Sequence, residues 1–276
     1  MEIRPVLVAA ALLATACSEA GAGQRTVVAS IYPLAFAADR IVGPGWEVID
    51  LTPPGTEAHD VELTLEDRAA IEDADVVLHL GVPGFQPQVD RAVQDSTGDA
   101  VAVWDRRPPP ASEGVVDPHA WLDPVRFAGM VGRIGSALGR PGATADLRAD
   151  LEALDVRYRD GLADCRSHTL VVSHEAFGYL ANRYGLEQVG LAGLEPEGEP
   201  TADALREAAE ALAAAGGGAV FYEAGEEARR IAETVASDAG VPALPLATLE
   251  SAPPAGDYLS VMDDNLESLR RGLGCP

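Results

Sequence analysis

Short runs of β-branched residues alternate with amphipathic stretches along most of the chain, beginning near Gln24. The predicted strands cover residues 26–31, 46–51, 76–80, 101–104, 169–173, 188–194, 219–223 and 243–248. The predicted helices cover residues 33–42, 64–73, 144–163, 176–184, 201–216 and 226–239, with another segment before Pro141 and a last one ending at Leu273. Strands that alternate with helices predict mostly parallel sheets with helices on both faces.

One predicted helix is unusually long and divides this pattern into two halves. Between Thr144 and Ala163, apolar residues recur at helical spacing and form one stripe, while most other positions are charged. We interpret this segment as a backbone helix that joins two Rossmann-like α/β lobes, although an ordinary surface helix would show the same pattern. The expected organisation is a first lobe at 24–141, a connecting helix at 142–164 and a second lobe at 165–276.

Composition narrows the range of functions. The 276 residues suggest about two domains. All 20 cationic residues are arginine, and 44 acidic residues give a net charge of −24. A nucleic-acid partner, or a membrane surface held by basic residues, requires a basic patch that this chain does not offer.

Residues 1–23 have the features of a bacterial export signal. An apolar run follows Arg4 and is too short to span a bilayer, and small residues lead to Cys17. The sequence 13–17 (LATAC) resembles a lipobox, in which Cys17 receives the lipid; plain signal cleavage near Ala16 is the alternative. Both predict an extracytoplasmic protein, and the first predicts a membrane-anchored lipoprotein.

Two cysteines remain, Cys165 and Cys275. Cysteines in an oxidising compartment usually pair, so we expect a disulfide that ties the C-terminus to the start of the second half. Two separate buried thiols are the alternative.

Three of the five histidines occupy distinctive positions. His59 follows a predicted strand, His174 ends another, and His119 lies in the turn 117–124 (DPHAWLDP). Ligands in open α/β sheets collect beyond the carboxyl ends of strands, where these residues could meet. Three imidazoles and a carboxylate suit zinc, but their spacing matches no local zinc motif. Of the others, His79 is expected in the core and His168 on the surface.

The segments around His59, His119 and His174 resemble the ligand motifs of the periplasmic zinc-binding proteins that feed ABC importers, the ZnuA/TroA-like family (cluster A-I). The resemblance is collinear over about residues 26–274 and includes the tail 256–266 (GDYLSVMDDNL). It implies a zinc-binding subunit that passes Zn(II) to a cognate permease. Because family members with a histidine at the third position tend to bind zinc, and those with glutamate manganese, His174 favours zinc.

The resemblance leaves the rest of the site less defined. It favours Glu250 as the fourth ligand, with Glu223 or water as competitors. Acidic residues beside the histidines either orient the imidazoles or are solvated: Asp60, Glu62, Asp117 and Asp123. Ala58 stands where the family commonly has proline, which would leave the His59 turn less fixed. The stretch 105–116 lacks the histidine-rich loop of many zinc members.

These observations predict a monomeric, non-enzymatic zinc-binding subunit of an ABC importer. The same scaffold could instead serve manganese or act as an adhesin. A secreted zinc hydrolase is a weaker alternative, since neither HExxH nor GxSxG occurs. Because imidazole must be neutral to bind zinc, affinity is expected to fall below about pH 6.5.

Overall fold

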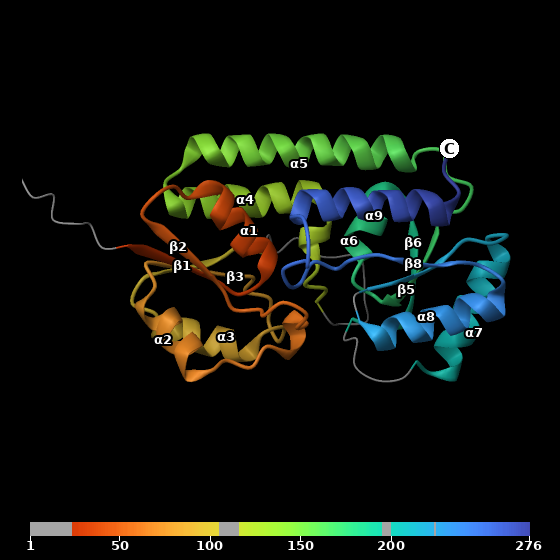
Figure 1. Cartoon of the computed structure of the whole chain (residues 1–276), viewed down its shortest axis with the longest axis horizontal. Helices are drawn as coiled ribbons and strands as arrows, with labels where there is room; N and C mark the ends of the chain where they lie inside the picture. The colour runs from red at the N-terminus through yellow and green to blue at the C-terminus, as the bar shows by residue number, and fades with distance from the viewer. Residues whose placement is uncertain (1–23, 105–115, 195–199, 224) are drawn as a thin grey trace, which may run out of the picture.

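The computed structural model describes residues 24–104, 116–194, 200–223 and 225–276 (Figure 1). The predicted leader with Cys17 lies outside the described residues, as does most of the stretch 105–116. Within the described part, no helix has both the length and the apolar character needed to span a membrane.

Each half of the chain forms a four-stranded parallel sheet, as the strand–helix alternation predicts (Figure 1). The first sheet has the order β2-β1-β3-β4 and comprises β1 (Arg25–Ala29), β2 (Trp46–Asp50), β3 (Val76–His79) and β4 (Asp99–Ala102). The second has the equivalent order β6-β5-β7-β8 and comprises β5 (Thr169–His174), β6 (Glu187–Ala192), β7 (Val220–Tyr222) and β8 (Ala243–Pro245). Because every pairing is parallel, all carboxyl ends of a sheet share one edge, where each lobe can place ligand side chains.

Helices cover both sheets, and several begin at a residue whose side chain caps the helix N-terminus by a hydrogen bond. They are α1 (Tyr32–Ile41), α2 (Leu65–Asp73), α3 (Pro87–Ala92), α4 (Pro124–Leu138), α5 (Pro141–Leu162), α6 (Gly178–Tyr184), α7 (Ala202–Ala214), α8 (Glu226–Ala239) and α9 (Tyr258–Leu273). Thr64 and Asp67 form a capping box at the start of α2, and the Thr201 side chain accepts a hydrogen bond at the start of α7.

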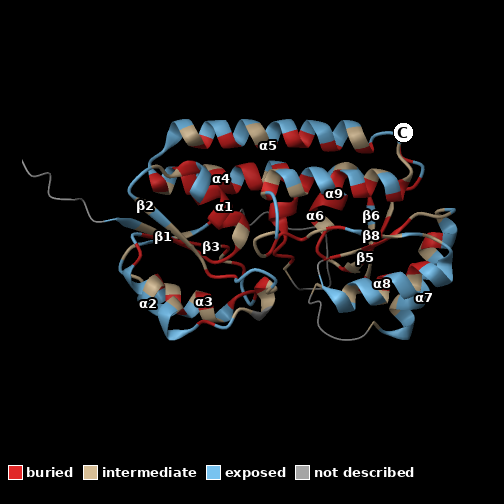
Figure 2. Cartoon of the chain, viewed as in Figure 1, coloured by how far each residue is buried: buried red, intermediate tan, exposed pale blue. Residues whose placement is uncertain are grey.

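Helix α5 extends over both lobes (Figure 1). Its inner face is buried against α4, α1 and α9, while its outer face is exposed (Figure 2). The buried face carries the predicted stripe: Leu147, Leu151, Leu154, Tyr158 and Leu162. Burial of this stripe against elements from both halves of the chain argues against a helix packed on one lobe alone.

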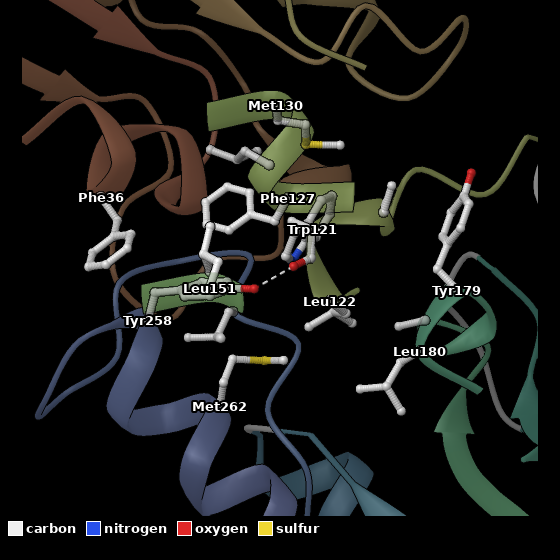
Figure 3. Close-up of a cluster of buried hydrophobic side chains, with 14 of the residues drawn as sticks. Phe36, Trp121, Leu122, Phe127, Met130, Leu151, Tyr179, Leu180, Tyr258 and Met262 are labelled. Carbon is white, nitrogen blue, oxygen red and sulfur yellow. Dashed lines mark hydrogen bonds between the residues drawn. The ribbon is translucent and has the colours of Figure 1, made fainter. Parts of the chain in front are cut away.

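The apolar cluster beneath these helices runs from one lobe to the other, and a smaller cluster lies in each lobe among the described residues. Trp121 and Phe127 of the first half pack in the same cluster as Leu180 and Met262 of the second (Figure 3). The Tyr258 hydroxyl donates to the Trp121 carbonyl oxygen at 2.6 Å, and the Trp121 indole N–H donates to the Thr248 carbonyl at 2.8 Å. The lobes therefore share buried side chains as well as a connecting helix.

The predicted disulfide between Cys165 and Cys275 is present. It closes a loop with a sequence separation of 110 and fixes the end of α9 beside the start of β5.

Replacing both cysteines by serine is expected to lower the free energy of unfolding of the metal-free chain by about 4 kcal/mol, because the bridge restricts a long loop in the unfolded state. Urea denaturation of the variant beside the oxidised chain measures the difference. A loss below about 1 kcal/mol would show that the bridge contributes little.

Candidate metal centre

Four side chains from distant parts of the sequence converge at the carboxyl edges of the two sheets. His59 lies in the short 3-10 turn Ala58–Asp60 after β2, His119 precedes the turn Ala120–Leu122, and His174 is the last residue of β5. Glu250 follows β8. One potential ligand atom from each of these four residues lies within 4.8 Å of the others.

The separations of these atoms suit a single tetrahedral ion. His119 Nε2 lies 3.3 Å from His59 Nε2 and 3.2 Å from Glu250 Oε1, and His59 Nε2 lies 4.0 Å from the same oxygen. Zinc bonds of ~2.0–2.1 Å at tetrahedral angles place neighbouring ligand atoms roughly 3.3 Å apart. His174 Nε2 is buried and has no hydrogen-bond partner among the described residues. Because this nitrogen is buried, unpaired within the described residues and close to the other three side chains, it is available to bind a metal ion.

Carboxylates behind two of the imidazoles fix their orientation. Asp117 Oδ1 lies 2.9 Å from His119 Nδ1 and also accepts from the His119 backbone N–H at 2.8 Å. Glu223 Oε1 lies 2.7 Å from His174 Nδ1. Each carboxylate favours a proton on Nδ1 and leaves Nε2 available for a metal.

Glu223, the alternative fourth ligand predicted from the sequence, is therefore not in the position of a ligand. Its Oε1 faces the Nδ1 side of His174 and also accepts from the Ser173 hydroxyl at 3.1 Å. The four-residue cluster contains Glu250 instead.

The remaining acidic candidates differ in their surroundings. The expectation that Asp123 orients an imidazole is wrong: Asp123 Oδ1 accepts from the Val125 and Arg126 backbone N–H groups at the start of α4, and it pairs with Arg183 of α6. Glu62 is exposed and forms no hydrogen bond to these histidines within the described residues. The side chain of Asp60 lies outside the described part of the structure.

Neither other histidine belongs to the cluster. His79 ends β3 largely buried, and its burial lowers its pKa despite the nearby Asp90 carboxylate. His168 is exposed before β5. The sequence-based expectations for both are consistent with these positions.

Glu250 belongs to the second half of the sequence but packs against residues of the first lobe. Its Oε2 accepts from the Ala58 backbone N–H at 2.7 Å, and its carbonyl oxygen accepts from the Tyr32 N–H at 3.3 Å. The preceding Leu249 has φ 58°, a left-handed conformation that is uncommon outside glycine and that turns the chain sharply before the ligand. His174 is thus the one member of the cluster that the second sheet carries.

Charge is balanced in the cluster by a proton on His119. Complete burial alone would lower the pKa of this imidazole, but the hydrogen bonds to Asp117 and Glu250, with their negative charges, raise it to about 9. Burial would likewise raise the pKa of Glu250, but the hydrogen bond from His119 and the neighbouring histidine charges lower it to about 2. Near neutral pH a divalent ion must therefore displace a proton from His119 to bind.

Replacing Glu223 by glutamine is expected to weaken zinc binding about tenfold, because the charge that orients and polarises the His174 ring is lost while its shape remains. Competition with a zinc chelator measures the affinity. Glu226→Gln, at the exposed start of α8, is the matched control. Equal affinities for the two variants would refute the role given to Glu223.

Two α/β lobes with three histidines and a carboxylate at their facing edges define a bilobed protein with a candidate metal site. Residues 27–272 match the family model described as ZnuA, the periplasmic component A of a zinc-uptake complex. The chain belongs to this family, which confirms the resemblance seen in the sequence. The family is one of transport components rather than of enzymes.

Individual relatives support the same assignment. The zinc-binding lipoprotein AdcA of Streptococcus pneumoniae is 30% identical over 95% of this chain, and the chain spans 58% of the length of that relative. The high-affinity zinc uptake protein ZnuA of Bacillus subtilis is 29% identical over 90% of this chain and 87% of its own.

Solved structures share the fold. The Zn(II)-bound ZnuA-like domain of Streptococcus pneumoniae AdcA matches with a TM-score of 0.76 and 27% identity, over 91% of this chain and 99% of that one. The laminin-binding protein of Streptococcus agalactiae, described as an adhesin with metal-transporting activity, matches with a TM-score of 0.81 and 27% identity, over 90% and 99%.

Proposed function

We propose that this chain is the zinc-binding subunit of an ABC importer. It binds one Zn(II) as cargo through His59, His119, His174 and Glu250, and passes the ion to a cognate permease. The observation that carries the proposal is the convergence of these four side chains at separations suited to one tetrahedral ion. The zinc-related names of the family and of the relatives support it.

The donor set favours zinc over manganese. Imidazole nitrogen is a better ligand for zinc, whereas manganese prefers carboxylate, carbonyl and water oxygens. Three nitrogen donors and one carboxylate therefore select against manganese by ligand chemistry. The adhesin alternative has the support of the laminin-binding neighbour, which is described as having both adhesin and metal-transporting activity.

The cellular setting follows from the same assignment. We propose that the protein acts outside the cytoplasm as a monomer, anchored in the membrane through a lipid on Cys17. The first lobe would comprise residues 24–141, the connecting helix 142–164 and the second lobe 165–276. The permease would then receive the ion at the membrane surface to which the chain is tethered.

Calorimetric titration of the metal-stripped chain tests the function. We expect one zinc per chain with a dissociation constant in the nanomolar range, about −12 kcal/mol, and manganese binding at least about a hundredfold weaker. Manganese binding as tight as zinc would favour the manganese alternative. No saturable binding of either ion would refute the proposal.

A further inference from the structure

A buried polar network lies directly behind the first-lobe side of the metal centre. Its centre is Gln86, which immediately precedes α3 and is only 6% exposed. The Gln86 side-chain nitrogen donates to the Ser30 carbonyl at 3.1 Å and to the Ala58 carbonyl at 3.2 Å. The Ser30 carbonyl also accepts from the Thr52 hydroxyl at 3.0 Å. The Gln86 side-chain amide, which follows β3, thus connects the segment after β1 (Ser30) to the segment after β2 (Ala58).

The Ala58 backbone connects this network to two ligands at once. Its carbonyl oxygen accepts from Gln86, its N–H donates to Glu250 Oε2 at 2.7 Å, and the next residue is His59. Ala58 itself is fully buried. Proline at this position would have no N–H to donate, so the alanine holds the turn by a bond that proline could not make.

His59 needs such support more than the other histidines. It is the least buried of the four cluster residues and lies in a three-residue turn, whereas His174 belongs to a strand. The ring of Phe85, the neighbour of Gln86, contacts the His59 ring edge-on with centroids 4.8 Å apart. The loop before α3 thus supports His59 in two ways: Gln86 binds the backbone of the preceding residue, and Phe85 contacts the His59 ring.

We propose that Gln86 is a positioning residue for metal binding: through the Ala58 backbone it holds His59 and Glu250 at the separation that one divalent ion requires. This inference rests on the proposed zinc-binding function. Loss of the Gln86 donors leaves the buried Ala58 carbonyl without this partner and frees the turn to shift. Partners of this kind behind metal ligands typically change affinity by about 10- to 100-fold.

The test measures zinc affinity by chelator competition in the full-length chain. Gln86→Met keeps the length of the side chain and removes both donors. Gln94→Met is the control, because Gln94 is exposed and, within the described residues, its side chain donates only to the Asp90 carbonyl. We expect a loss of about 10- to 100-fold for Gln86→Met and less than about twofold for the control.

A double-mutant cycle separates positioning from general stability. If Gln86 acts through the His59 turn, Gln86→Met should weaken zinc binding several-fold less in a His59→Ala background than in the unmodified chain, because there it acts only through Glu250. An equal loss in both backgrounds, or no loss in the unmodified background, would overturn the inference. Failure of the unmodified chain to bind zinc would instead refute the proposed function.

Gln86→Leu provides a second variant if Gln86→Met does not fold. It removes the same two donors from the Ser30 and Ala58 carbonyl oxygens and keeps an apolar side chain of similar volume. It should weaken zinc binding by about 10- to 100-fold, as Gln86→Met does. Unchanged affinity in a folded Gln86→Leu chain would overturn the inference.

Discussion

Alanine at position 119 is expected to reduce zinc affinity by on the order of a thousandfold. His119 is fully buried, lies closest to both His59 and Glu250, and is held by Asp117. Its removal deletes one of the four ligands. Loss of a partner behind a metal ligand typically costs about 10- to 100-fold in affinity, and loss of the ligand itself is expected to cost about a further tenfold.

Elemental analysis of the purified protein, followed by chelator competition, measures this effect. His168→Ala is the matched control, because His168 is exposed and outside the cluster. The control should retain one zinc per chain and the His119 variant very little. Equal zinc content in both would exclude His119 as a ligand.

Zinc affinity is expected to increase with pH up to about 9. Because the pKa of His119 is raised to about 9, the metal-free site carries a proton that zinc must displace. Affinity should therefore rise about tenfold per pH unit well below pH 9, and about fiftyfold between pH 7 and pH 9. The sequence alone placed this change below about pH 6.5, since it could not show the carboxylates on either side of the ring. A flat profile between pH 7 and pH 9 would contradict the account.

The same titration changes the stability of the metal-free chain in the opposite direction. His119 has a folded pKa above its ordinary value of 6.5, so its stabilising contribution is complete below about pH 6.5 and is lost as pH rises through about 9. Glu250 has a lowered pKa, so its contribution is present above about 4.5 and is lost as pH falls through about 2. Thermal denaturation across this range, with and without zinc, would show the two trends diverge toward alkaline pH.

The hydrophobic pattern predicts the architecture well, because parallel strands and amphipathic helices have distinct periods. The helix Glu226–Ala239 has the predicted bounds. The strand predicted at 101–104 starts two residues earlier in the structure, at Asp99–Ala102. Asp99 and Ala100 are exposed, so the hydrophobic pattern did not include them, although both pair with β3. The backbone N–H groups of Val103 and Trp104 also donate to carbonyls at the end of β3 and just after it. The six-residue helix α3 is not predicted, because so short a segment shows no periodicity.

The sequence could indicate the histidines of the site but not all of the roles around them. Residues that end parallel strands share one edge, so His59 and His174 were expected to meet. Side-chain direction decides the rest: Glu223 follows β7 but faces the back of His174, and Asp123 caps a helix despite its place in the histidine motif. No sequence pattern indicates the proposed role of Gln86, because its side chain binds backbone carbonyls rather than a ligand side chain.

Zinc-edge X-ray absorption spectroscopy of the full-length chain loaded with one zinc tests the central claim most directly. The account predicts a four-coordinate ion with three imidazole nitrogens and one carboxylate oxygen at ~2.0–2.1 Å. A spectrum with sulfur in the coordination shell, or with fewer than two imidazoles, would contradict it.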